Sequence, residues 1–120
     1  MINMNASQIF NIIINDQEFI VNSNLKNWQI HPQRSSYVDY IAINTSIIEL
    51  FLQFKNGTCF IFKDVPIETM NDAIEANSIG RFYKKSIKGK FENELVGMWW
   101  IIEALEYEEY GNDWDSDYFE

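Results

Sequence analysis

Basic and aromatic side chains alternate in one short stretch of the 120-residue sequence, from Arg81 to Phe91, which holds five of the nine Lys and Arg residues. Lysine and arginine neutralise phosphates while aromatic rings stack on bases, so the combination is typical of nucleic-acid-binding surfaces. We therefore predict that this stretch contacts a phosphate-bearing ligand, either a nucleic-acid strand or a nucleotide. The alternative is structural: Phe82, Ile87 and Phe91 would pack in the core and leave the lysines in solvent. The predicted ligand-binding residues are Arg81, Phe82, Tyr83, Lys84, Lys85 and Lys88.

Acidic side chains are concentrated in the C-terminal part of the sequence. Residues 92–120 hold ten acidic side chains and no basic one, whereas residues 1–91 have a net charge of +1. Acids that alternate with aromatic rings can imitate a nucleic acid and fill a basic groove on another protein. On this alternative hypothesis the protein is a small phage-type inhibitor of a basic host or defence protein. The predicted partner-binding residues are Glu106, Glu108, Glu109, Tyr110, Asp113, Trp114, Asp115 and Asp117.

The acidic segment has further interpretations. It could fold back on the basic stretch and shield it, or it could be only a solubilising tail. Asp113, Asp115 and Asp117 have the alternating spacing of a calcium loop, but Tyr118 stands where such loops have glycine. We therefore expect no metal. We also expect no cofactor, because the five glycines are scattered and form no phosphate-binding loop.

The single thiol and the single imidazole do not indicate catalysis. Cys59 lies in the apolar run 58–62, where a small buried side chain in a reducing compartment is the ordinary interpretation. His31 is followed by Pro32, and neither a Ser–His–Asp nor a Cys–His pattern includes it. We expect a non-catalytic, cytoplasmic binding protein, without a leader or a membrane segment. A homo-oligomer that holds a signalling nucleotide at a subunit junction is a third possibility.

Hydrophobic patterns predict the elements that must position these residues. A content of 47% hydrophobic and 16% aromatic residues excludes a disordered chain. Runs of β-branched and aromatic residues predict a hairpin over 9–21 and strands over 37–43 and 48–54. Asn56-Gly57 predicts a tight turn, followed by a returning strand over 58–64. We expect the polar segment 22–34 to be an irregular linker whose Trp28 docks on the core.

Two helices are predicted after these strands. The first begins at Pro66 and ends at Gly80, and a basic connector follows over 81–91. The second covers 94–107, although residues 99–102 also fit a strand. The predicted fold class is α+β: a small antiparallel β-sheet, made of the N-terminal hairpin plus three further strands, packed with one or two helices. We expect residues 1–120 to form a single domain, with the hairpin and linker in 1–33 and an acidic helix and tail in 92–120.

A series of short motifs runs through the middle of the chain in a distinctive order. It contains Ser35-Ser36-Tyr37, a strand pair turning at Gly57, Phe60-Ile61-Phe62, Val65-Pro66, the run from Ala76 to Tyr83, and Ile87. Together these motifs resemble the KTSC domain, over about residues 34–91. That family occurs at the C-terminus of some lysyl-tRNA synthetases and as stand-alone proteins of bacteria and phages. The resemblance implies a small antiparallel sheet with a helix, and RNA as a suggested ligand. The family's usual Tyr-x-Tyr is here Phe60-Ile61-Phe62, so two hydroxyls that could contact a ligand are missing.

Deleting residues 108–120 separates the two main hypotheses. We expect the shortened protein to bind single-stranded RNA as well as the full chain does, or better, because six carboxylates no longer repel phosphates or cover the basic stretch. Fluorescence anisotropy at low and moderate salt measures the affinity. A deletion that instead abolishes inhibition of a basic partner protein, in a chain that never binds RNA, would favour the inhibitor hypothesis.

Overall fold

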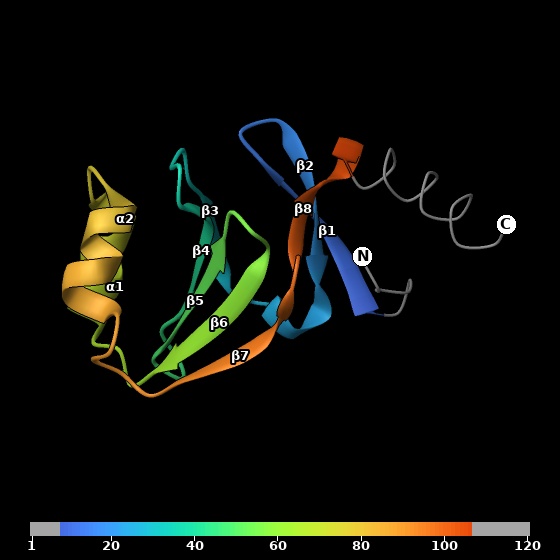
Figure 1. Cartoon of the computed structure of the whole chain (residues 1–120). Coiled ribbons are helices and arrows are strands. Elements are labelled where there is room, and N and C mark those ends of the chain that lie inside the picture. Colours follow the sequence, from blue (N-terminus) through green and yellow to red (C-terminus); the bar gives the residue numbers. More distant parts are fainter. Residues whose placement is uncertain (1–7, 107–120) are drawn as a thin grey trace, which may run out of the picture. The chain divides into compact units, whose positions relative to one another are not determined.

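The computed structural model describes residues 8–106, and their contacts divide them into two compact units. The larger unit is Asn27–Met98, and the smaller one combines residues 8–26 with residues 99–106. Both contain an antiparallel sheet, and the larger one also contains the helices labelled α1 and α2 (Figure 1). The α+β class predicted from the sequence is therefore confirmed.

The smaller unit is a three-stranded sheet in the order β1-β2-β8, formed by β1 (Ile9–Ile14), β2 (Gln17–Asn22) and β8 (Ile101–Glu103). The predicted N-terminal hairpin is present. Its turn residues Asn15 and Asp16 have φ angles of 50° and 65°, a conformation that Asn and Asp adopt more readily than other non-glycine residues. The 3₁₀ helix η2 (Ser23–Leu25) follows β2. Ile20, Ile102 and Ala104 form the buried cluster of this unit.

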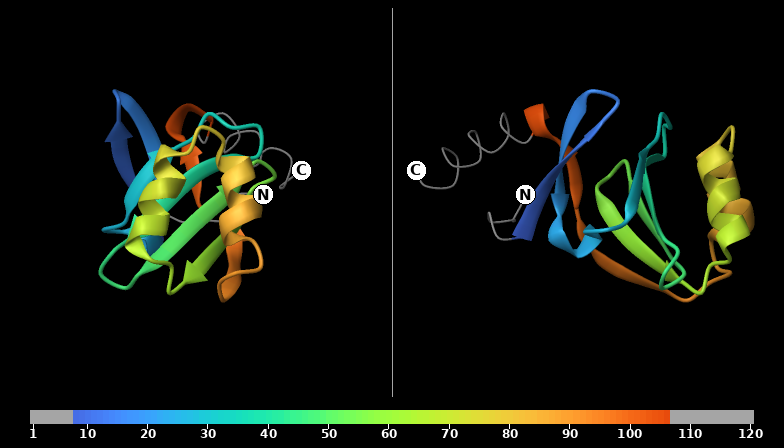
Figure 2. Two further views of the ribbon diagram at one scale, coloured as in Figure 1. Left: turned by 90° about the vertical axis from the view of Figure 1, so that its left-hand side faces the viewer. Right: turned by 180° about the vertical axis from the view of Figure 1, so that it is seen from behind.

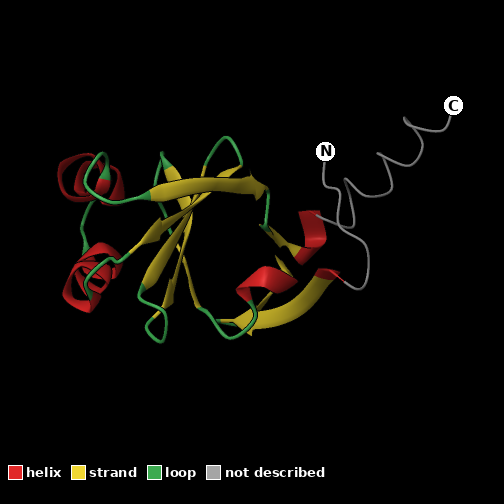
Figure 3. Cartoon of the chain, turned by 90° about the horizontal axis from the view of Figure 1, so that it is seen from below, coloured by secondary structure: helices red, strands yellow, loops and turns green. Residues whose placement is uncertain are grey.

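The larger unit is a five-stranded antiparallel sheet covered on one face by helices. Its strand order is β3-β4-β5-β6-β7. The helices lie together over the same face of the sheet, as the views from the helix side and from below show (Figures 2 and 3). Within the described residues, no helix has the length and apolar character needed to cross a membrane. The elements of this unit are β3 (Gln29–Pro32), β4 (Val38–Asn44), β5 (Glu49–Phe54), β6 (Thr58–Lys63), α1 (Ile67–Glu75), α2 (Ile79–Phe82), the π-helix η3 (Tyr83–Ile87) and β7 (Asn93–Met98).

The main core lies between this sheet and its helices. Alternate residues of β5, Leu50, Leu52 and Phe54, face the helices, as the period of two in the sequence predicts. Met70 and Ala73 of α1 meet them from the other side. The Asn56-Gly57 turn is also as predicted: Gly57 has φ 93°, and the Asn56 Oδ1 accepts a hydrogen bond from the Thr58 amide at 3.1 Å. Burial of these apolar side chains is the main stabilising term of the unit.

The predicted linker over 22–34 is wrong in its second half, where β3 pairs with β4. The register joins His31 to Ile41 and Pro32 to Tyr40. Pro32 is tolerated because β3 is an edge strand, in which one row of amides needs no partner. β3 has only four residues, most of them polar, and so short a segment shows no periodicity that would indicate a strand. Its pairing with β4 therefore decides the conformation.

The predicted helix over 94–107 is also wrong. Residues 93–98 form β7 against β6, and residues 101–103 form β8 against β2. Apolar residues recur at helical spacing there, but Gly97 and the left-handed Trp99 (φ 55°) disfavour a continuous helix. Among the described residues of this segment, only 104–106 are helical.

The helix predicted to end at Gly80 ends earlier, and the predicted basic connector is helical. α1 stops at Glu75, and a second helix begins after Ser78, whose Oγ accepts a hydrogen bond from the Arg81 amide at 3.3 Å. Serine at this position caps a helix N-terminus and so restarts the helix. Gly80 therefore lies inside α2 and does not end α1.

Ile48 is the one β-branched residue with a positive φ in the described chain, at 57°, and it lies at the end of the β4–β5 turn. We expect Ile48→Gly to raise the free energy of unfolding by about 1 kcal/mol, because glycine adopts this conformation without strain. Urea denaturation measures the change. The neighbouring Ile47→Gly is the matched control, since Ile47 is similarly exposed but has no positive φ. That control should be destabilising by about 0.5–1 kcal/mol, and equal effects of the two variants would contradict the strain.

Candidate ligand-binding site

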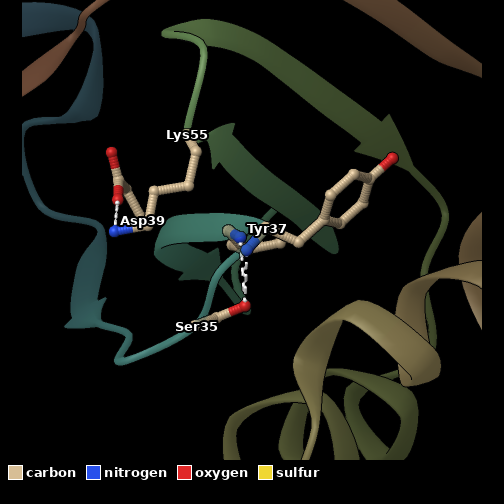
Figure 4. A network of polar contacts seen from close by, with 5 residues as sticks. Ser35, Tyr37, Asp39 and Lys55 are labelled. Atoms are coloured by element: carbon tan, nitrogen blue, oxygen red, sulfur yellow. Dashed lines mark hydrogen bonds and ion pairs between the residues drawn. The ribbon is translucent and has the colours of Figure 1, made fainter.

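Tyr37 is held by its backbone just before β4. The Ser35 Oγ accepts hydrogen bonds from the amides of Tyr37 at 3.0 Å and Val38 at 3.2 Å. On the other side, the Lys55 amide donates to the Tyr37 carbonyl oxygen at 3.0 Å. Figure 4 shows the Tyr37 ring extending away from the ion pair between Lys55 and Asp39. The backbone of Tyr37 is thus tied to the β5–β6 turn, which fixes where its ring begins.

Phe54 is the centre of an aromatic cluster built from four separate segments. Its ring centroid lies 5.3 Å from that of Tyr37, 5.1 Å from Tyr83 and 5.9 Å from Phe60. All three pairs have the edge-to-face geometry that aromatic rings favour. Phe62 completes the cluster through Phe60 and Tyr83. These rings join the entry to β4, the β5–β6 hairpin and η3.

An open cleft of about 300 Å³ lies over this cluster, and we call it the aromatic cleft. Aromatic rings form its walls, while an ammonium group, an amide and a hydroxyl contribute polar groups. The Lys55 Nζ is 2.9 Å from Asp39 Oδ1, so this ammonium is already paired. The residues that line the cleft are Tyr37, Phe54, Lys55, Asn56, Thr58, Phe60 and Tyr83.

Four exposed cations follow one another on α2, on η3 and at the residue directly after η3, at spacings of three, one and three residues: Arg81, Lys84, Lys85 and Lys88. We call them the basic face. No carboxylate among the described residues forms an ion pair with any of them. The Lys84 Nζ lies 5.0 Å from the centroid of the Tyr37 ring, within the range of a cation–π interaction. Tyr37 therefore belongs to the aromatic cleft and also contacts the basic face.

Tyr83 lies between the cleft and the core, and its surroundings alter its acidity. Burial, and to a lesser extent the nearby Tyr37, raises the pKa of the Tyr83 phenol above its ordinary value of 10.0. The phenol therefore stays protonated across the physiological range. It can donate a hydrogen bond to a ligand in the cleft as well as present a ring face.

Comparisons with known proteins agree with this architecture. The KTSC domain model matches residues 34–91. The crystal structure of a KTSC domain protein from Yersinia pestis is 30% identical in sequence, with a TM-score of 0.57, and the match covers 58% of this chain and 99% of that one. The chain belongs to the KTSC domain family. A search of curated proteins found no match.

The structure brings the predicted ligand-binding residues of the KTSC domain onto one helical segment but divides them between two environments. Arg81, Lys84, Lys85 and Lys88 are exposed, whereas Phe82 packs against the core. Ile87 and Phe91 also pack there, as the structural alternative predicted. Tyr83 lines the cleft. The basic face and Tyr83 are therefore available to a ligand, and the ring of Phe82 serves packing.

Sequence reasoning missed most of the aromatic cleft. The sequence places Tyr37, Phe54 and Phe60 in predicted strands or family motifs, and Lys55 directly before the predicted Asn56-Gly57 turn, without indicating that they meet. They are distant in sequence and become neighbours through the β4–β5–β6 pairing. The one available signal was the Ser35-Ser36-Tyr37 motif, in which serine precedes the aromatic residue by two positions.

The acidic partner-binding residues lie almost entirely outside the described part of the chain. Glu106 is exposed, and no structural statement applies to its predicted companions. The same holds for the aspartate series that begins at Asp113. Among residues 8–106, no group of three or more His, Cys, Asp or Glu side chains could hold a metal ion. The companions of Glu106 are Glu108, Glu109, Tyr110, Asp113, Trp114, Asp115 and Asp117.

The thiol and the imidazole have structural surroundings. Cys59 is fully buried, and its Sγ lies 3.3 Å from the Gly57 carbonyl oxygen and 3.6 Å from Gln53 Oε1, to which it can donate. His31 lies in strand β3, and its buried Nε2 has no hydrogen-bond partner among residues 8–106. Burial lowers the pKa of His31 below its ordinary value of 6.5.

The His31 shift predicts a pH dependence of stability. The unfolded chain protonates at about pH 6.5, and the folded chain does so only at lower pH, so the unfolded state binds more protons between the two pKa values. The free energy of unfolding should therefore fall as the pH drops from 6.5 toward the folded-state pKa, and His31 contributes nothing above that window. Urea unfolding of the wild type and of His31→Gln at several pH values isolates this effect from the carboxylates. Parallel curves for the two proteins would contradict it.

Proposed function

We propose that this KTSC domain protein binds, without chemical conversion, a ligand that carries a planar base and at least one phosphate. A nucleotide and a nucleic-acid strand both have this chemistry. The observation that carries the proposal is the contact between Lys84 and Tyr37, which places an ammonium group next to the aromatic cleft. Ring and cation are the two groups that a base and its phosphate require.

Each half of the ligand has suitable groups in the described structure. A base entering the aromatic cleft can stack on Tyr37 or Tyr83, an interaction worth about 1–3 kcal/mol per base. The Asn56 Oδ1 already accepts hydrogen bonds from the Thr58 amide and hydroxyl, so the Asn56 Nδ2 can donate to the base edge and the Thr58 Oγ1 can accept from it. The phosphate would contact Lys84 and its neighbours on the basic face, which have no carboxylate partner among residues 8–106.

The charge distribution supports the same proposal. The net charge of −9 belongs to the C-terminal segment, because residues 1–91 together carry +1. Lys84 lies next to Tyr37 of the aromatic cleft, and its neighbours on the basic face are also cationic, so the local field favours an anion. The buried thiol of Cys59, without a disulfide partner, fits a protein that meets nucleotides in the reducing cytoplasm. The inhibitor hypothesis concerns residues outside the described structure and stays a prediction from the sequence.

Charge reversal tests the phosphate half of the proposal. We expect Lys84→Glu plus Lys85→Glu to abolish binding of a short single-stranded oligoadenylate at low salt, because two phosphate contacts become repulsive. Replacing the same two lysines by glutamine should instead reduce the slope of log K against log salt concentration by about 1.4, at about 0.7 per contact.

The matched control changes the net charge by the same amount elsewhere. Lys26→Glu plus Lys63→Glu should leave most of the affinity in place, because neither lysine belongs to the basic face. Equal losses in the two charge-reversed proteins would show that only the overall charge matters. An absence of oligoadenylate and adenosine monophosphate binding in the wild type at low salt would refute the proposed function.

A further inference from the structure

A second open cleft, of about 360 Å³, lies between the segment before β4 and the connection from α1 to α2. We call it the polar cleft, because hydroxyl, amide and guanidinium groups predominate among its lining side chains. It shares no residue with the aromatic cleft. The residues that line it are Gln33, Arg34, Ser35, Ser36, Ala76, Asn77, Ser78 and Ile79.

The two clefts are consecutive along the same pair of segments. Ser36 lines the polar cleft and the next residue, Tyr37, lines the aromatic one. On the facing segment, Ile79 lines the polar cleft and Tyr83 the aromatic one. Between them the segments touch: a Cβ built on Gly80 would lie 3.4 Å from the Tyr37 Cβ. Tyr37 therefore stands between two neighbouring cavities.

Some polar groups of this cleft are already used within the protein, and others are not. The hydroxyls of Ser35 and Ser78 accept backbone hydrogen bonds, and the Gln33 amide donates to the His31 carbonyl oxygen. The side chains of Arg34 and Asn77, by contrast, have no hydrogen-bond or ion-pair partner among residues 8–106. Like Ser36, which lines the same cleft, they can donate to the phosphate or ribose of a bound strand.

We propose that the polar cleft holds the sugar and phosphate of a second nucleotide, so that the ligand is a single-stranded nucleic acid whose first base occupies the aromatic cleft. This inference rests on the proposed function and narrows its ligand class. Tyr83 follows Ile79 by four residues, which corresponds to a rise of about 6 Å along a helix. Stacked nucleotides are only about 3.4 Å apart along each strand. Two subsites whose lining residues have this larger spacing suit consecutive nucleotides that are unstacked, as in a single strand.

A comparison of two probes tests the second subsite. We expect the wild type to bind short oligoadenylate at least tenfold more tightly than adenosine monophosphate, measured by isothermal titration calorimetry at low salt, because only the longer probe reaches both clefts. Asn77→Asp places a negative charge in the polar cleft with almost no change of shape. It should weaken oligoadenylate binding about tenfold and leave adenosine monophosphate binding unchanged.

The control is Asn71→Asp, which adds the same charge on the exposed surface of α1 and should leave both affinities unchanged. Arg34→Gln is a second test variant, which removes a cation from the polar cleft and should also act on the oligomer alone. Equal affinity of the wild type for both probes, or no oligomer-specific effect of either polar-cleft variant, would overturn the second subsite while the proposed function stands. Failure of both probes to bind the wild type would overturn both.

Discussion

The packing of the Phe54 ring is the interaction on which the organisation of the larger unit depends. Phe54 ends β5, and its edge-to-face contacts reach Tyr37, Phe60 and Tyr83, which belong to three different segments. The entry to β4 and the π-helix also meet directly, with the ring centroids of Tyr37 and Tyr83 6.0 Å apart, and the Phe54 ring packs against both. The ring is largely buried, so its contacts also contribute the hydrophobic stabilisation that holds the helices on the sheet.

The same packing also positions the aromatic cleft in which we propose that a ligand binds. Phe54, Phe60 and Tyr83 pack in or against the core, and all three also line the aromatic cleft together with Tyr37. Tyr83 lines the cleft, whereas Arg81, Lys84 and Lys85 of the same helical segment are exposed to solvent. Stability and the proposed ligand binding thus use some of the same residues. A site of this kind is preorganised, since a ligand need not order the side chains that it contacts.

Much of the local structure could be predicted because the deciding forces are local. The hairpin of β1 and β2, the Asn56-Gly57 turn and the start of α1 at Pro66 each follow from residues within one short segment. The family resemblance, confirmed over residues 34–91, rests on the order of such segments. Prediction failed where a distant strand decided the conformation. Residues 93–98 have apolar side chains at helical spacing, yet their amides and carbonyls pair with β6. Backbone hydrogen bonding to a neighbouring strand outweighs helix propensities, which differ by well under 1 kcal/mol for most residues.

The candidate binding site, too, could be predicted only in part from the sequence. The sequence by itself determined that cations are concentrated over residues 81–90, that the acidic excess lies after residue 91, and that a KTSC domain occupies the middle of the chain. These properties follow from the composition and the order of the residues alone. Only the tertiary structure decided that Phe82 is a packing residue, that Tyr37, Phe54 and Tyr83 form one cluster, and that a polar cleft adjoins the aromatic one. The reason is physical: which side chains are neighbours depends on strand register and on which helix face is buried, and both are set by contacts between residues far apart in sequence.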